Sequence, residues 1–271
     1  MKSYAIYDKA LQRENPIGYL FYFEDSKSYI VELCDDLDEW EAPLLFQKYV
    51  CEKEFTIEEG ATLMWIRERV IPPGRQNIGA ILKRYKMKEY NEMDFLALSG
   101  GRCSQDECYI REVSLEDIPN DIQTRQSKTL TECFPTEDGA LLCLFRDNAV
   151  YKVELNRLEG KHPDAARIRK HRPLLDSVKV GAGGYTAVFD ESIKIPYKIL
   201  RQQGKRLPLV AKDFCAFINR SVLDTTRVCE MLHCSRQNLA YLVKERKIHP
   251  IIQGTKENLY LRGEVERLKA D

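Results

Sequence analysis

The stretch with the most chemical information is CSRQNLAYLVKERK, residues 234–247. Its first polar side chains are a guanidinium and two amides, Arg236, Gln237 and Asn238. An arginine can bond guanine and an amide can bond adenine, each through two hydrogen bonds. Three cations follow at a distance that suits phosphate contacts, Lys244, Arg246 and Lys247. This combination predicts sequence-specific contact with duplex DNA.

Such side chains need two helices to hold them. Thr225 or Thr226 is expected to cap a first helix, whose apolar face is Val228, Cys229 and Leu232. His233–Cys234 forms a short turn, and Ser235 caps a second helix through its hydroxyl. The inward positions of that helix are Leu239, Leu242 and Val243. Tyr241 and the polar side chains therefore point elsewhere.

A hairpin and a closing helix are expected to complete this segment. IHPIIQGTKENLYL predicts two short strands with GTKEN at the tip, where Lys256 and Asn258 can reach DNA. LRGEVERL predicts the last helix. As a recognition helix presents its first turn to the major groove, the placement of the amides fits as well as their chemistry.

TTRVCEML, CSRQNLAYLV, IHPIIQG and LYLRGEVERL together resemble the winged helix-turn-helix of excisionases and MerR-type regulators, over about a fifth of the chain. The resemblance implies DNA binding. The expected contact residues are Ser235, Arg236, Gln237, Asn238, Tyr241, Lys244, Arg246, Lys247, Lys256 and Asn258. Glu245 and Glu257 lie among them and weaken a purely electrostatic grip. The alternative is a small helical module for dimerisation or protein docking.

The charge of the chain is divided between its halves. The formal net charge is zero, but residues 1–120 carry 15 basic and 23 acidic side chains, a net of −8, and the remainder carries +8. Zero net charge alone argues against a simple polybasic nucleic-acid binder. The division predicts that only the second half approaches phosphates.

Residues 127–200 resemble a small bacterial module, domain-of-unknown-function family 2442. The matching phrases are FPTEDGALLCLF-RDNAVYKVEL, RIRKHRPLLDSVKV and AVFDESIKIPYKIL, with hairpin turns at RDNA and at GAGG. A basic cluster lies within it: Lys161, His162, Arg167, Arg169, Lys170, His171 and Arg172. It is interpreted as a solvated helix face, with a phosphate-contacting surface as the alternative.

Residues 4–112 resemble the small N-terminal subdomain of HipA-type toxin kinases, through IGYLFYF and MWIRERVIPPGRQNIGAILKRYKMKEYNEMDFLALSGGRCSQD. No kinase core follows, because no ATP-holding lysine strand or catalytic Asp with a metal-binding partner is present. An interaction module is the remaining interpretation. Its acidity repels DNA and favours a protein partner.

No enzymatic site or cofactor is expected. GAGG is not followed by the Lys-Ser/Thr of a P-loop, and the four histidines have no metal or nucleophile spacing. The pairs Cys103/Cys108 and Cys229/Cys234 are interpreted as small apolar residues rather than zinc ligands. Trp40 and Trp65 are expected in the core. Without an export signal or an 18-residue apolar run, the chain is expected in the cytoplasm, nucleoid-associated if DNA-bound, and not in a membrane.

The sequence therefore predicts an α+β protein of three small modules: residues 1–120, residues 125–205 and a winged helix-turn-helix at residues 215–271. The expected function is a bacterial or phage transcriptional regulator that binds double-stranded DNA. A homodimer is expected, because one small helix-turn-helix buries little surface, and the front modules are expected to supply it. The alternative is an adaptor or antitoxin-like inhibitor that binds a protein through residues 1–120.

Overall fold

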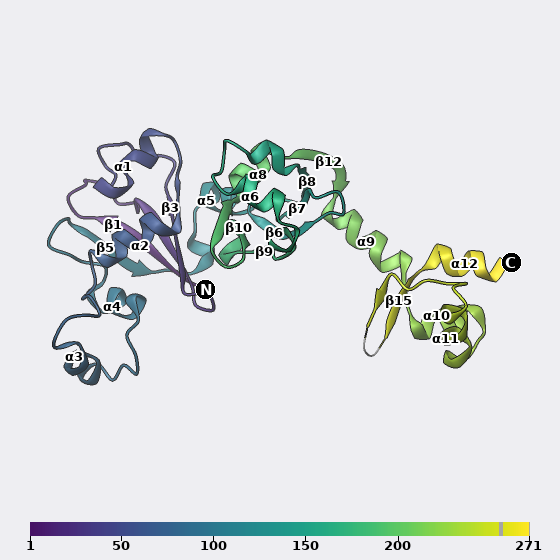
Figure 1. Ribbon diagram of the computed structural model, residues 1–271. Coiled ribbons are helices and arrows are strands. Elements are labelled where there is room, and N and C mark those ends of the chain that lie inside the picture. Colours follow the sequence, from purple (N-terminus) through teal and green to yellow (C-terminus); the bar gives the residue numbers. More distant parts are fainter. Residues whose placement is uncertain (255–256, 271) are drawn as a thin grey trace.

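The front of the chain builds a five-stranded antiparallel sheet in the computed structural model, which describes residues 1–254 and 257–270 (Figure 1). The strand order is β4-β3-β2-β1-β5. The bounds are β1 Lys2–Asp8, β2 Gly18–Phe23, β3 Ser28–Leu33, β4 Thr56–Ile57 and β5 Cys108–Glu112. The alternation around EDSKS predicted the β2–β3 hairpin, and the pairing of Leu20 with Val31 confirms it.

Helices cover both faces of this sheet. One face buries side chains of α1 (Leu44–Cys51), α2 (Glu59–Arg67) and α4 (Glu92–Ser99), among them Phe46, Trp65 and Leu96. The other face packs against α5 (Asn120–Gln126) through Ile122, next to the short helix η1 (Leu115–Asp117). The helix α3 (Ile78–Arg84) has no buried residue.

The middle of the chain contains two further antiparallel sheets. The first has the order β12-β8-β7-β6 and the second β11-β10-β9. Their bounds are β6 Leu130–Pro135, β7 Leu141–Phe145, β8 Ala149–Val153, β9 Lys179–Val180, β10 Thr186–Phe189, β11 Ile193–Pro196 and β12 Lys205–Val210. The helices are η2 Leu155–Leu158, α6 Ala165–Lys170, α7 Arg172–Asp176, η3 Ala182–Gly184 and α8 Tyr197–Gln203. The hairpin predicted around RDNA is β7–β8.

The GAGG segment is a turn between β9 and β10, as its glycines predicted. Gly183 and Gly184 have φ angles of 60° and 80°, a region that side chains rarely adopt. A Cβ on Gly184 would meet the carbonyl oxygen of Leu130, because the backbones of the turn and β6 are in close contact. Glycine at this position permits that close backbone contact.

The front and middle sheets share a core. Ile30 of β3 is buried together with the middle residues Phe145, Phe189 and Leu200. At the same boundary Arg125 of α5 bonds the fully buried carboxylate of Glu32 at 2.9 Å. Burial raises the pKa of the Glu32 carboxyl, while the Arg125 guanidinium opposes that rise. Because α5 lies within this contact, the segment where the predicted modules 1–120 and 125–205 adjoin is an ordered part of it.

A single helix, α9 (Ala211–Ser221), joins the front and middle sheets, called here the double unit (residues 1–210), to the C-terminal part of the chain (Figure 1). The last part contains β13 (Val222–Asp224), α10 (Thr225–Leu232), α11 (Arg236–Lys244), β14 (Ile252–Gln253), β15 (Asn258–Leu261) and α12 (Arg262–Ala270). Its sheet has the order β13-β15-β14.

The structure confirms the α+β class and corrects one core assignment. Trp65 is 1% exposed, as expected, but Trp40 is 81% exposed, because it lies in the loop between β3 and α1 instead of on an inward face. None of the helices in the described part of the chain is long and apolar enough to cross a membrane.

Candidate nucleic-acid interface

The C-terminal part has its own small core. The buried side chains come from each of its helices, from β13 and β15, and from the loop after α11: Leu223, Val228, Leu239, Ile248, Tyr260 and Val265. Leu242 and Val243 pack against this cluster, as their positions on the predicted helix required. The core fixes α11 with one side inward, so the opposite side is available for contact with a ligand.

Side-chain caps begin both α10 and α11. The Ser235 hydroxyl accepts a hydrogen bond from the backbone N–H of Asn238 at 3.2 Å, which confirms the predicted cap of α11. The cap of α10 is Asp224 and not a threonine, since its carboxylate accepts from the Arg227 amide at 2.8 Å. An ionised carboxylate also interacts favourably with the positive end of the helix dipole.

The turn between the helices forms as predicted. His233 adopts a left-handed conformation with φ 52°, and this residue ends α10. Thr225, displaced from the cap, instead bonds the hairpin: its hydroxyl donates to the Asn258 carbonyl and accepts from the Asn258 amide, both at 3.3 Å. The threonine therefore joins the start of α10 to the strand β15.

The exposed side of α11 has a centre and two flanks. Gln237, Tyr241 and Lys244 are spaced by four and three residues, so they form one ridge opposite the buried Leu239. Arg236 and Asn238 are also exposed but lie on either side of this ridge. The Arg236 guanidinium donates to the Thr226 hydroxyl at 2.9 Å, which directs it toward α10.

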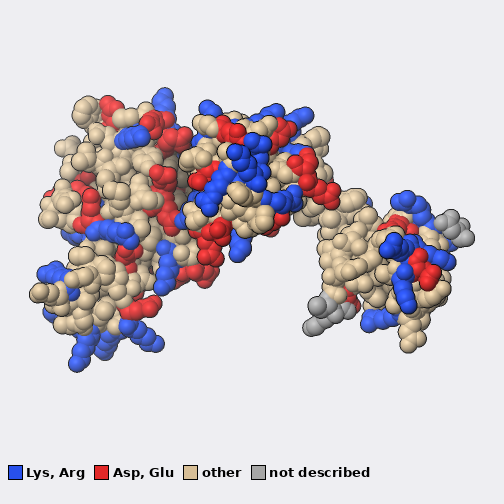
Figure 2. Space-filling model, in the orientation of Figure 1, with Lys and Arg blue, Asp and Glu red and all other residues tan. Residues whose placement is uncertain are grey.

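The residues that follow α11 add exposed cations. Arg246 and Lys247 lie in a tight turn, in which the Lys247 amide donates to the Leu242 carbonyl at 3.0 Å. Glu245 lies between these cations and Lys244 and is exposed as well. Figure 2 shows this mixture of Lys/Arg and Asp/Glu on the C-terminal part. Residues 219–271 carry ten basic and seven acidic side chains, so the excess of positive charge is modest.

The predicted hairpin is present as β14 and β15, with Gln253 paired to Asn258. The structure does not bring the Asn258 side chain to the exposed ridge. Asn258 is half-buried, and its side-chain Nδ2 lies 3.4 Å from the Tyr260 hydroxyl. Lys256 lies outside the described residues. Of the ten expected contact residues, eight are therefore exposed on or beside α11.

The cysteine pairs have the character of packing residues. Cys229 and Cys234 are half-buried, and burial together with the Cys234 thiol raises the pKa of Cys229. Burial also raises the pKa of Cys108. A raised pKa disfavours the thiolate that binds metals. Within residues 1–254 and 257–270, no three His, Cys, Asp or Glu side chains gather in a way that could hold a metal ion.

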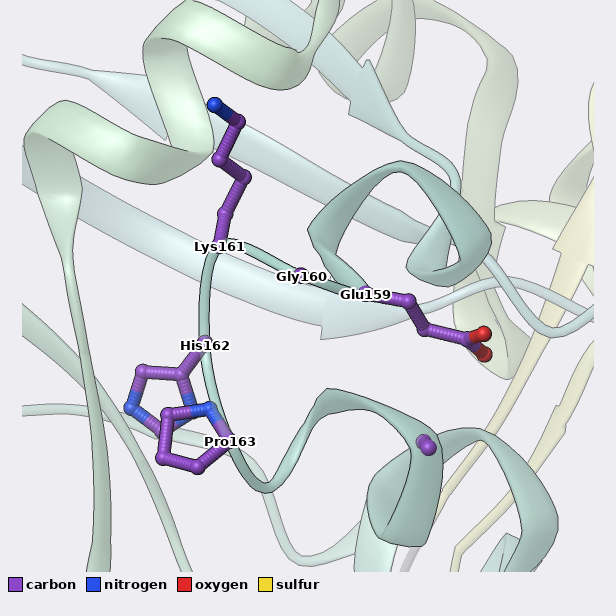
Figure 3. Close-up of a pocket in the computed structure, with 6 residues that line it drawn as sticks. Glu159, Gly160, Lys161, His162 and Pro163 are labelled. Atoms are coloured by element: carbon purple, nitrogen blue, oxygen red, sulfur yellow. The ribbon is translucent and has the colours of Figure 1, made fainter.

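A shallow hollow of about 260 Å³ lies at one end of the basic cluster 161–172 (Figure 3). Of that cluster only Lys161 and His162 line it, together with Glu159, Gly160, Pro163 and Ala166. Glu159 and Lys161 point away from one another there, so their side chains do not converge. The His162 ring is used twice: Nδ1 accepts from the Asp164 amide at 3.3 Å, and Nε2 lies 3.2 Å from the Lys194 carbonyl. Arg169 pairs with Glu159. The Glu159 carboxylate and the His162 ring are therefore both held by contacts within the chain.

Sequence reasoning missed an exposed apolar pair in the front module. Trp40 is 81% and Leu44 is 86% exposed, although both types are usually buried. The adjacent acidic residues of CDDLDEWEAP were a signal that this loop is solvated.

No family model, curated protein or solved structure matches this chain.

Proposed function

We propose that residues 222–270 form a winged helix-turn-helix and that the chain is a sequence-specific DNA-binding regulator. The observation that supports this function is the exposed ridge Gln237, Tyr241 and Lys244 on a capped helix whose opposite side is buried. A major groove about 12 Å wide accepts one helix, and the ridge is the part that would enter it.

The chemistry of the ridge suits base edges. The Gln237 amide can donate to and accept from adenine, and Tyr241 offers an apolar ring with a hydroxyl. Arg236 and Asn238 reach the same groove from the flanks, with Arg236 suited to guanine. Gln237 is therefore the primary specificity residue of the proposal, ahead of Arg236, which bonds Thr226.

Positioning on the duplex falls to the cations after the ridge. Lys244, Arg246 and Lys247 are exposed and suit phosphate contacts. Counterion release makes such contacts sensitive to salt, with a slope that falls by about one per lost phosphate contact. The acidic Glu245 beside them limits non-specific affinity, so base contacts carry a larger share of the discrimination.

Titration of the full chain with its preferred duplex and with a scrambled duplex tests this proposal. Gln237→Ala should reduce the preference between them by about 5- to 150-fold, the worth of one bidentate base contact. Lys247→Ala should weaken both complexes alike and lower the salt slope by about one. Gln105→Ala, an exposed glutamine of the front module, is the control and should change neither. Absence of binding to any duplex at low salt would refute the function.

A second candidate function, protein binding by the front module, is favoured by the loop that carries Trp40. This loop is braced from within: one carboxylate oxygen of Asp38 accepts from the amides of Trp40 at 2.8 Å and Glu41 at 2.9 Å. Arg13 bonds Glu41 at 2.9 Å and Asp36 at 3.0 Å. A Trp presented on a braced loop loses little conformational entropy on binding.

The charge around Trp40 specifies the partner's chemistry. The flanking carboxylates are Asp35, Asp36, Asp38, Glu39 and Glu41. A partner with an apolar pocket surrounded by Lys and Arg is complementary to this surface. Comparison of proteins retained by the wild-type chain and by Trp40→Ala tests it, with Met64→Ala, 58% exposed on α2, as the control. A retained protein lost only with Trp40→Ala is expected, and identical retention by all three would oppose it.

A further inference from the structure

The helix α9 presents an apolar stripe that is largely exposed in the described chain, with only Phe214 half-buried. Phe214, Phe217 and Ile218 recur at the three- and four-residue spacing of one helix face. Phe217 is 56% and Ile218 38% exposed, and no residue of α9 is buried. Leu209 and Val210, which precede the helix, are 36% and 37% exposed. Contiguous exposed apolar side chains of this kind mark interaction surfaces.

The stripe lies on the only segment between the double unit and the C-terminal helices (Figure 1). The surface where α9 meets those helices is mostly uncharged in Figure 2. No salt bridge within the described residues involves a side chain of α9, so a partner helix can approach the stripe without displacing a structural ion pair.

Two charges beside the stripe favour a particular partner. Asp213 and Arg220 are seven residues apart, so they lie two turns apart on the same flank of the stripe. Both are exposed, and neither takes part in a salt bridge within the described residues. The opposite flank carries Ala211 and Ile218.

A second copy of α9 in antiparallel orientation satisfies this pattern. A two-fold axis perpendicular to the helices brings the same flank of both copies together. Asp213 of each copy then faces Arg220 of the other, while the Phe217 rings meet near the axis. In a parallel pair opposite flanks meet. Asp213 and Arg220 would then face only Ala and Ile positions.

We infer that α9 is a self-association surface and that two chains pair through it, antiparallel, about an axis near Ala216–Phe217. Three helical turns bury less than the roughly 1,200 Å² of a stable interface, so the association is weak. This places self-association on α9 rather than on the front modules. If the proposed DNA function holds, the two-fold axis also requires inverted half-sites.

Sedimentation equilibrium of the full chain, from low to several hundred micromolar, tests the apolar part of the inference. A reversible monomer–dimer equilibrium is expected. Phe217→Ser should weaken it by at least about tenfold, the effect of losing one buried aromatic contact. Tyr85→Ser removes a similarly exposed ring directly after α3 and should leave the monomer–dimer equilibrium unchanged. A chain that stays monomeric throughout, or a dimer insensitive to Phe217→Ser, would overturn the inference.

A charge exchange tests the orientation. Asp213→Arg and Arg220→Asp should each weaken the dimer, because like charges then face one another across the axis. The double variant restores both pairs and should recover the wild-type dissociation constant within about twofold. Failure of the double variant to recover would contradict the antiparallel arrangement.

The outcomes for self-association and for DNA binding can be separated. A monomeric chain that still binds one half-site would overturn the α9 surface and leave the proposed function standing. A dimer that binds no duplex would refute the proposed DNA-binding function and leave the α9 self-association surface standing. With both intact, Phe217→Ser should reduce affinity for two inverted half-sites while leaving affinity for a single half-site unchanged.

Discussion

The contact between the front and middle sheets and the connection to the C-terminal helices use different physical means. The first contact shares a core and contains a fully buried carboxylate with an arginine partner. The second connection is a helix without a buried side chain. Residues 1–210 should therefore unfold as one unit, while the C-terminal part should unfold separately. Under the proposed function, a C-terminal part that folds separately could adjust to DNA without disturbing the rest of the chain.

Loss of the buried ion pair should have the largest effect. Arg125→Met leaves the Glu32 carboxylate 0% exposed without its cation, which should cost about 3–5 kcal/mol of unfolding free energy in residues 1–210. Urea denaturation followed by circular dichroism measures this loss. Arg157→Met removes an exposed pair with Glu154 and should cost less than about 1 kcal/mol. Equal effects of the two variants would mean that the buried contact does not hold the unit together.

Truncation in the small core should separate the two units. Leu239 is 2% exposed in a cluster of six buried residues, so Leu239→Ala should destabilise the C-terminal part by about 2–4 kcal/mol. Differential scanning calorimetry should show that transition moving to lower temperature while the transition of residues 1–210 stays in place. A single transition that moves as a whole would remove the distinction between the two units.

Alkaline pH should act on the first unit through Tyr197. Burial raises the pKa of Tyr197 to about 12, against about 10 in the unfolded chain. The unfolded state loses its proton first, so the stabilisation is present below about pH 10 and is lost as the pH rises toward 12. Tyr197→Phe should remove roughly 1.4 kcal/mol of the loss seen by about pH 11 in urea titrations. Tyr241→Phe in the C-terminal part should leave this pH dependence unchanged, and an equal change there would contradict the assignment.

The caps should give the smallest effect. Asp224→Ala removes the carboxylate that bonds the Arg227 amide and should cost about 1 kcal/mol in the C-terminal transition. Thr226→Ala should cost much less, because that hydroxyl caps nothing and only accepts from Arg236. Thermal unfolding of the two variants compares them directly. The reverse order of effects would restore threonine as the cap.

Periodic apolar patterns predicted much of this architecture. Alternation identified the strands around EDSKS and RDNA, and the inward Leu239, Leu242 and Val243 were correctly placed on α11. These features are local, because strand and helix periods act over a few residues. The order of turn, helix and hairpin in the C-terminal part was predictable for the same reason.

Features that depend on distant partners were not predictable. The predicted second module ends at residue 205, but residues 205–210 pair with β8, a contact that spans more than fifty residues. Asp224, Thr225 and Thr226 are all good capping types, and only the contact between Thr225 and Asn258 selects the aspartate. The exposure of Trp40 and of the α9 stripe was not predictable either. Both are apolar, and the residue types alone do not show whether another part of the chain covers them.

Selection of bound duplexes from a random pool by the full chain tests the central claim most directly. At low salt the wild-type chain should enrich a short motif with adenine at the position that Gln237 contacts. Gln237→Ala should lose the preference for adenine at that position. If the wild-type chain retains no duplex and the pool stays random, the proposal of sequence-specific DNA binding is contradicted.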